Sequence, residues 1–384
     1  MIFSSINFKN FKIKKKNSKL KTYLKLILKK KDSVITSLGT DYNLSFDKKK
    51  ILKYKKFSNY RLIGMGGSSL GAQAIFEFLK IKIKKKFYFI DNLESKYFEH
   101  NKRKYLNLII SKSGNTIETI VNANILIKKK DENIFITENK KNFLNLLAQD
   151  LKSEVIQHNN FIGGRYSVLS EVGMLPAELM GLDVRKFKQL DNLVKNKNFV
   201  NSLVSNVASI IFHVKNKKFN SVIINYDPKS RNLFNWYQQL VAESLGKKSK
   251  GILPIISNMP KDNHSVMQLY LDGFKNNFFT FFYSKSNNSV KINNKKIFST
   301  HNYLKYKSVD QILMAQKKAT EKVFLKKNIP FRSFEIKENN EKTLGELFCF
   351  FILETILLAH ALKVNPYDQP SVELIKKETK KILI

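Results

Sequence analysis

Two runs of alternating strand and helix patterns constrain the fold more than any other feature of this sequence. In the first run, an apolar strand over Tyr60–Gly64 leads into a glycine-rich turn, Gly64–Gly71, and then into a helix over Ala72–Leu79. Further strands are predicted at Leu106–Ile110 and Ile134–Thr137. Such alternation is typical of parallel sheets that are covered by helices on both faces. The sequence therefore predicts an α/β fold.

A second alternation begins after residue 220. Apolar strands are predicted at Ser221–Asn225, Gly251–Ile256 and Asn276–Tyr283, with a helix between the first two. A chain of 384 residues is long enough for two domains. We expect each domain to be a mostly parallel sheet flanked by helices, with extra helices at the ends of the chain. The expected parts are an N-terminal helical segment at 1–56, a first domain at 57–183 and a second domain with the C-terminal helices at 184–384.

One helix of the second alternation, Asn235–Gly246, carries a carboxylate beside an amide. Its apolar residues recur near the helical period and predict a buried face, formed by Trp236, Leu240, Val241 and Leu245. Gln239 and Glu243 are four residues apart, so they share another face. Near the end of the helix, Glu243 could act as a general base toward a ligand. The alternative is an exposed glutamate on an amphipathic helix.

Small hydroxyl side chains follow the strand Leu106–Ile110 at the start of a predicted helix. They belong to Ser111, Ser113 and Thr116. The N–H groups of a helix start, its dipole and the charge of Lys112 would together hold a phosphate group. Asn115 and Glu118 have capping-box spacing, so an ordinary capped turn is the alternative. The sequence lacks the glycine-lysine pattern of nucleoside triphosphate sites, and its first glycine-rich turn lacks the dinucleotide spacing.

A glycine pair precedes an arginine in the segment Asn160–Leu169. Gly163 and Gly164 permit close approach of the backbone, and Arg165 could direct a fixed positive charge at a developing oxyanion. The alternative is a buried arginine that pairs with a carboxylate for structural reasons.

Two further candidates lie in the last third of the chain. His264 heads a predicted helix and is the only one of six histidines in a polar, site-like context. The alternative is a surface or structural residue, as most lone histidines are. Lys376 lies in a helix that starts near Pro370. The buried stripe of that helix is predicted at Val372, Ile375 and Leu383. Most lysines of this chain are expected to be solvated, which is the alternative for Lys376.

Composition narrows the possible partners. The chain has 69 Lys and Arg against 31 Asp and Glu, a net charge of +38, but only six of the basic residues are arginine. Readers of nucleic acid rely on arginine for bidentate contacts, so we expect no specific nucleic acid partner. An anionic small substrate would still arrive faster in a positive field.

Other bulk features point to a cytoplasmic protein without a metal. No segment reaches the roughly 18 apolar residues of a membrane helix, so no membrane is expected. The N-terminus lacks the apolar core of a signal peptide. The single cysteine, Cys349, fits a reducing compartment. No His or Cys cluster has metal-ligand spacing.

Taken together, these pieces resemble glucose-6-phosphate isomerases, the phosphoglucose isomerase family. The resemblance runs from about Leu62 to Lys377 and rests on six motifs in the family's order. They lie at 66–68, 111–119, 163–167, 242–247, 264–269 and 367–376. The resemblance implies two sugar-isomerase (SIS) domains and a homodimer in which His264 acts in the neighbouring subunit's site.

The resemblance also implies the reversible isomerisation of glucose 6-phosphate and fructose 6-phosphate, in glycolysis and gluconeogenesis. Glu243 resembles the base that moves a proton between C2 and C1, and Arg165 the group that stabilises the cis-enediolate. His264 resembles the acid that opens the sugar ring, with Lys376 as its helper. The implied substrate contacts are Ser111, Lys112, Ser113 and Thr116 at the phosphate, Gln239 and Gln369 beside it, and Gly67 and Ser68 along the sugar.

This chemistry is coherent with the residues themselves. One carboxylate suffices to hold and return the proton, and a fixed guanidinium stabilises the enediolate, so we expect no cofactor. Three alternatives stay open within the fold: a dual phosphoglucose and phosphomannose isomerase, a glucosamine-phosphate isomerase domain, and a non-catalytic SIS protein that binds sugar phosphates. A basic nucleic-acid binder is the alternative outside it.

Overall fold

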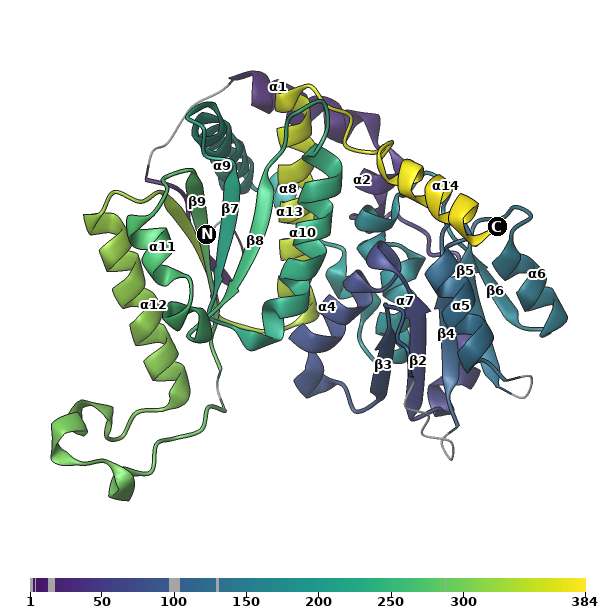
Figure 1. Ribbon diagram of the computed structural model, residues 1–384, viewed down its shortest axis with the longest axis horizontal. Helices are drawn as coiled ribbons and strands as arrows, with labels where there is room; N and C mark the ends of the chain where they lie inside the picture. The colour runs from purple at the N-terminus through teal and green to yellow at the C-terminus, as the bar shows by residue number, and fades with distance from the viewer. Residues whose placement is uncertain (1–2, 4, 13–17, 97–103, 129–130, 287) are drawn as a thin grey trace.

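The strands form two separate five-stranded sheets, with helices packed around both (Figure 1). The computed structural model describes the whole chain except residues 1–2, 4, 13–17, 97–103, 129–130 and 287. The expected α/β fold with two mostly parallel sheets is confirmed. The domain boundaries at 56/57 and 183/184 stay predictions.

The first sheet is parallel throughout and has the strand order β3-β2-β4-β5-β6. Its strands are β2 at Asn59–Gly64, β3 at Lys86–Ile90, β4 at Leu106–Ile110, β5 at Glu132–Thr137 and β6 at Glu154–Gln157. The helices between and after them are α4 at Leu70–Phe78, α5 at Ile117–Leu126, α6 at Phe143–Asp150 and α7 at Glu171–Leu179. Gly64 pairs with Ile110, so the loops that follow β2 and β4 leave the sheet side by side.

The second sheet has the order β1-β10-β9-β7-β8, and only β1 runs antiparallel to its neighbour. Its strands are β1 at Ile6–Lys9, β7 at Asn220–Asn225, β8 at Leu253–Asn258, β9 at Asn277–Ser284 and β10 at Phe331–Ile336. The helices in this later part of the chain are α8 at Leu190–Lys195, α9 at Lys197–Lys215, α10 at Arg231–Leu245, α11 at Met267–Asp272, α12 at Val309–Lys326, α13 at Glu341–Leu362 and α14 at Val372–Leu383.

The N-terminal segment is less uniform than predicted. Its described residues form helices α1 at Ser18–Lys30, α2 at Ser33–Ser37 and α3 at Lys48–Leu52, as expected for a helical segment. It also supplies β1, which pairs with β10 at the edge of the second sheet. Sequence analysis missed both strands. β1 has only four residues among lysines, and its partner lies more than 300 positions away, so no local pattern marks the pair.

α13 forms the centre of the core. It has 22 residues and is buried without interruption from Thr343 to Ala359. By length and composition it could cross a membrane, contrary to the expectation that no segment would qualify. Because nearly all of it is buried within the fold, it is better explained as a core helix.

α10 links the two halves of the molecule. It packs against α13 on one side and against α4 of the first sheet on the other (Figure 1). Its predicted apolar face is confirmed, since Trp236, Leu240, Val241 and Leu245 are all buried. At its start, the Asn232 N–H donates to the Glu77 carboxylate of α4 at 3.0 Å. The face of α10 that carries Gln239 and Glu243, away from this apolar face, lies at the junction of the two halves.

Candidate active site

A polar cluster at this junction is organised around Arg165. The residue lies in the short helical segment η4, Gly164–Leu169, and is only 2% exposed. Its Nη1 donates to Glu243 Oε2 at 3.2 Å, and its Nε donates to Ser244 Oγ at 2.9 Å. Gln239 Nε2 donates to Glu243 Oε1 at 2.8 Å. Both oxygens of the Glu243 carboxylate thus have defined partners, one on the same helix and one from the other half of the molecule.

The loop after α13 accounts for the remaining donors of the guanidinium. Arg165 Nη1 also donates to Gln369 Oε1 at 3.1 Å, and Nη2 donates to the carbonyl oxygens of Pro366 and Asp368 at 2.5 Å and 3.0 Å. With the two contacts on α10, these bonds match the five N–H donors of an arginine. The loop is itself held by an ion pair between Lys247 and Asp368 at 2.8 Å, and this bond lowers the pKa of Asp368.

The glycine-rich turn after β2 packs directly on the Arg165 segment. It forms the short helical segment η2, Gly66–Ser68. A Cβ atom at Gly67 would overlap the backbone of Gly164, and one at Gly66 would come within 2.8 Å of Gln239 Nε2. Gly66 has a φ of +53°, which glycine adopts without strain. The turn is therefore glycine-rich because two backbones approach closely, and Ser68 lies half-buried at its end.

The hydroxyl-rich loop after β4 lies beside this turn. Ser111 Oγ and Thr116 Oγ1 are 2.9 Å apart, and Ser113 is exposed, with its Oγ accepting from Asn115 N at 3.2 Å. Lys112 Nζ donates to the Asn160 carbonyl oxygen at 2.8 Å, which joins this loop to the segment before Arg165. The same ammonium group lies 3.4 Å from Glu138 Oε1. The loop places three hydroxyl groups before the N-terminus of α5, an arrangement suited to an anion.

The capping box predicted at Asn115 and Glu118 is wrong. The residue at the N-cap of α5 is Thr116, and it makes no side-chain capping bond. Asn115 Oδ1 instead accepts from Phe143 N of α6 at 3.0 Å. The two residues do have capping-box spacing, but the Asn115 side chain bonds to the backbone of a neighbouring helix instead. A partner so far away in the chain cannot be predicted from local spacing.

His264 is not brought to the cluster within one chain. It ends the segment η7, Lys261–His264, which follows the carboxyl end of β8, and it is exposed. Glu243 lies near the C-terminal end of α10, which precedes the amino end of β8. A strand of six residues spans roughly 20 Å, so the two side chains lie toward opposite ends of the strand.

Lys376 is also apart from the cluster. It lies on α14 and forms an exposed ion pair with Glu373 at 2.7 Å. The predicted buried stripe of this helix is wrong, since Val372, Ile375 and Leu383 are 40%, 70% and 72% exposed. Figure 1 draws α14 at the periphery of the first half of the molecule. The amphipathic pattern was read correctly, but no described part of this chain covers its apolar face.

Sequence reasoning missed Tyr166 and Ser244. The Tyr166 hydroxyl lies 2.7 Å from Ser244 Oγ and donates to the Pro366 carbonyl oxygen at 3.1 Å. Burial raises the pKa of Tyr166, so the phenol stays protonated. The only signal was their position, because each directly follows a candidate residue in the chain.

A buried group beneath the Arg165 segment was missed as well. His158 Nδ1 lies 2.8 Å from Glu171 Oε1, and the Tyr42 hydroxyl donates to Glu171 Oε2 at 2.8 Å. The same carboxylate accepts from Asn159 N at 2.7 Å. Burial by itself would raise the pKa of Glu171, but the bond and charge of His158 hold that pKa below its ordinary value. Glu171 therefore fixes the chain just before Gly163 and Arg165.

No metal centre accompanies these groups in the part of the chain that the structure describes. There, His, Cys, Asp and Glu side chains form no group of three or more that could hold an ion. The groups that the cluster provides are the Glu243 carboxylate, the Arg165 guanidinium and the nearby anion site.

Known proteins resemble this chain over most of its length. The family model described as Phosphoglucose isomerase matches residues 47–384. A glucose-6-phosphate isomerase from Methanocaldococcus jannaschii is 32% identical over 380 residues, covering 92% of this chain and 91% of the relative. One from Mycoplasmopsis pulmonis is 33% identical over 350 residues, covering 84% and 82%.

Solved structures share the fold at lower identity. A hypothetical protein from Thermus thermophilus superposes with a TM-score of 0.83 at 22% identity, covering 95% of this chain and 94% of that one. A glucose-6-phosphate isomerase from Chlamydia trachomatis superposes with a TM-score of 0.70 at 18% identity, covering 88% and 72%. A tagatose-6-phosphate ketose/aldose isomerase from Escherichia coli superposes at 0.52 and 13% identity, covering 84% and 88%.

Proposed function

The chain belongs to the phosphoglucose isomerase family, and on that premise we propose how its own residues carry the reaction. It is an aldose–ketose isomerase that interconverts glucose 6-phosphate and fructose 6-phosphate reversibly, a step of glycolysis. The observation that carries the assignment of residues is the cluster in which Arg165, Glu243 and Gln239 meet at the junction of the two halves.

Glu243 is the proposed base. Its two oxygens are held by Gln239 and Arg165, so the carboxylate keeps one orientation, and 28% of its side chain remains exposed. One carboxylate can take the proton from C2 and return it to C1, because an aldose–ketose exchange moves a single proton between neighbouring carbons. The reverse reaction uses the same group.

Arg165 is the proposed stabiliser of the cis-enediolate. All five of its N–H donors are engaged, and the acceptor on the exposed side is the Gln369 side chain. We propose that a sugar oxygen replaces Gln369 Oε1 when substrate binds, while the other contacts hold the guanidinium in place. A donor that is fixed in this way needs little reorganisation as negative charge develops.

The loop after β4 is the proposed phosphate site. Ser111, Ser113 and Thr116 supply hydroxyl donors, Lys112 supplies charge, and the N-terminus of α5 supplies its dipole. The turn at Gly67 and Ser68 follows the neighbouring strand, so it lies between this loop and the Arg165 cluster, where the sugar would extend. Support comes from the register of β2 and β4 and from the packing of Gly67 on Gly164.

His264 is proposed to open the sugar ring in the site of a neighbouring subunit, with the protein acting as a homodimer. Two observations support this assignment: His264 is exposed, and it lies at the opposite end of β8 from Glu243. A second copy of the chain could bring its own His264 close to Glu243. Lys376 is proposed as its helper at the ring oxygen on the motif at 367–376 alone, since its ammonium group lies in an exposed ion pair. The proposed location is the cytoplasm, where the buried thiol of Cys349 would stay reduced.

The direct test is turnover of fructose 6-phosphate to glucose 6-phosphate by the purified chain, followed through a coupled dehydrogenase. Mannose 6-phosphate is assayed in parallel. Turnover of the first substrate alone is the expected result. Turnover of both would make the protein a dual isomerase, and sugar phosphate binding without turnover would indicate a binding protein that has lost the chemistry.

A further inference from the structure

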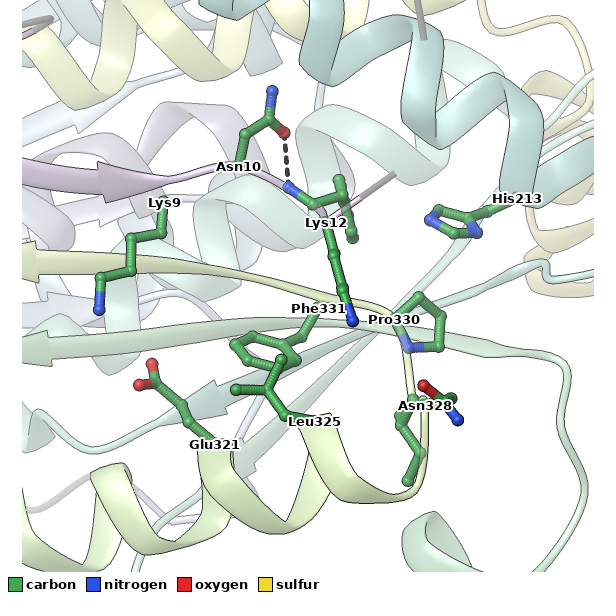
Figure 2. Close-up of a pocket in the computed structure, with 11 residues that line it drawn as sticks. Lys9, Asn10, Lys12, His213, Glu321, Leu325, Asn328, Pro330 and Phe331 are labelled. Atoms are coloured by element: carbon green, nitrogen blue, oxygen red, sulfur yellow. Dashed lines mark hydrogen bonds between the residues drawn. The ribbon is translucent and has the colours of Figure 1, made fainter. Parts of the chain in front are cut away.

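A cavity lies at the edge of the second sheet, away from the proposed active site. It encloses about 570 Å³ between the end of β1, the C-terminal ends of α9 and α12, and the start of β10 (Figure 2). None of its lining residues belongs to the proposed catalytic or substrate-binding set. Its volume falls in the usual range of small-molecule sites.

The inner wall of the cavity carries a buried imidazole with an unused nitrogen. His213 is 3% exposed, and among the described residues its Nε2 has no hydrogen-bond partner. The ring stacks on Phe278 at 5.9 Å and contacts the edge of Phe11 at 5.0 Å. Burial lowers the pKa of His213 to about 4, so the ring is neutral near pH 7. An unpaired polar atom in such surroundings is costly, and a bound ligand could satisfy it.

The opening of the cavity is positively charged. Lys9 and Lys12 are exposed there, and Figure 2 shows the Lys12 side chain reaching across the opening toward Pro330. The one carboxylate in the lining, Glu321, is already paired with Lys317 at 2.9 Å. The local charge therefore favours an anion over a cation.

Apart from Asn10 and Asn328, the rest of the wall is apolar. Leu325 and Ile329 come from the end of α12 and the turn after it, and Phe331 begins β10 (Figure 2). A ligand that consisted of a charged group alone would leave this apolar surface in contact with water. A ligand with an apolar body would bury it, which is the main source of binding energy for small molecules in such sites.

We propose that this cavity binds a small apolar monocarboxylate. The carboxylate lies between the Lys12 ammonium group and the His213 Nε2–H group, and the apolar body follows Leu325, Ile329 and Phe331. The site is independent of the sugar-phosphate site, so its ligand and glucose 6-phosphate are expected to bind together.

The test is calorimetric titration of the full chain with octanoate. We expect one site per chain that saturating glucose 6-phosphate does not displace. His213→Phe keeps the stacked ring and removes the nitrogen, and it should weaken binding about tenfold, as the loss of one charge-assisted hydrogen bond predicts. Leu325→Trp, which fills the cavity, should weaken binding at least as much.

Matched controls separate this site from general attraction to a basic protein. Lys318→Gln removes an exposed charge from the same helix, α12, and should leave octanoate binding unchanged. Each variant must retain its isomerase turnover, which shows that it is folded. No binding of octanoate, equal binding by the His213→Phe and Leu325→Trp variants, displacement by glucose 6-phosphate, or equal binding of octan-1-ol would each overturn the proposal.

Discussion

At the scale of single residues, the protein orients one carboxylate and one guanidinium against each other. Glu243 is held by Gln239 within its own helix and by Arg165 from the other half of the molecule. Ser244, the next residue in the chain, accepts from the Arg165 Nε–H group, so a single turn of α10 positions both the proposed base and its charged partner. The reactive geometry thus depends on few side chains, each of which can be tested separately.

Replacing Glu243 with glutamine should abolish proton transfer while leaving sugar-phosphate binding largely intact. The amide keeps the shape of the side chain but has no basic oxygen, so we expect kcat to fall by about a hundred- to ten-thousandfold. Coupled turnover and equilibrium binding of glucose 6-phosphate measure the two effects. Glu378→Gln, an exposed change on α14, is the control. Near-normal turnover of Glu243→Gln would remove this residue from the proton transfer.

Replacing Ser113 with alanine should mainly raise KM. Its hydroxyl is exposed beside the start of α5, so it would contact the phosphate in the ground state and the transition state alike. Loss of such uniform binding changes KM by about tenfold and leaves kcat nearly constant. Steady-state kinetics with fructose 6-phosphate give both constants. An unchanged KM would mean that the phosphate binds elsewhere.

At the scale of elements, three loops of the first half of the molecule are brought together by strand register and by close packing of their backbones. The turn after β2 and the loop after β4 are neighbours through the strand register, and the segment at Gly163–Arg165 packs on the first of them. The buried Glu171 of α7 then fixes that segment through Asn159 and His158. The position of Arg165 is therefore determined partly by groups outside the proposed substrate contacts.

Glu171→Gln should impair catalysis through position. The amide cannot accept at both ends, so it loses a bond to Tyr42 or His158 and loosens the segment before Arg165. We expect kcat/KM to fall about ten- to a hundredfold, because small misplacements of catalytic groups are costly. Steady-state kinetics give kcat and KM separately, and the loss should lie in kcat.

The control is Glu178→Gln on the same helix, α7, where the carboxylate pairs with Lys55 outside the cluster. It should cost stability without a specific loss of kcat. An equal fall of thermal stability and activity in both variants would reduce Glu171 to a structural residue.

At the scale of the whole molecule, the role proposed for His264 requires two copies of the chain. His264 and Glu243 lie toward opposite ends of β8, and α14 presents an apolar face that no described part of this chain covers. A symmetric dimer can bring His264 of one chain close to Glu243 of the other.

Mixing two inactive variants tests this arrangement. If His264 acts in the neighbouring subunit, Glu243→Gln and His264→Ala chains can form a mixed dimer with one intact site. Refolded together in equal amounts, they should recover about a quarter of the wild-type activity, since half of the dimers are mixed and each has one working site. No recovery from a mixture that does form mixed dimers would place His264 and Glu243 in the same chain's site.

Stability should depend on pH through His213. Burial lowers its pKa from 6.5 to about 4, so between these values the unfolded chain binds a proton that the folded chain does not. Stability should therefore fall as the pH drops from about 6.5 to 4. In His213→Phe this loss is absent, so the difference in melting temperature between the two proteins should change over that range. Asp227, whose pKa burial raises to about 6, titrates alike in both and cancels. Parallel curves would contradict the prediction.

The sequence by itself determined the fold class, most elements and the charged members of the cluster around Arg165. The two alternations predicted two parallel sheets, and the helical period of Trp236, Leu240 and Val241 correctly oriented α10. These features are local, because burial imposes a period on neighbouring residues. The motif resemblance then selected Glu243 and Arg165, which lie 78 positions apart and which the structure brings to 3.2 Å.

Only the tertiary structure decided the rest. The β1–β10 pair, the clamp around Glu171 and the partner of Asn115 all join residues that no local pattern relates. The same holds for the exposed face of α14: its amphipathic period was evident, but whether an apolar stripe is covered depends on what packs against it. A local pattern predicts which face of a segment is apolar. Whether that face is buried depends on which other segments pack against it in three dimensions.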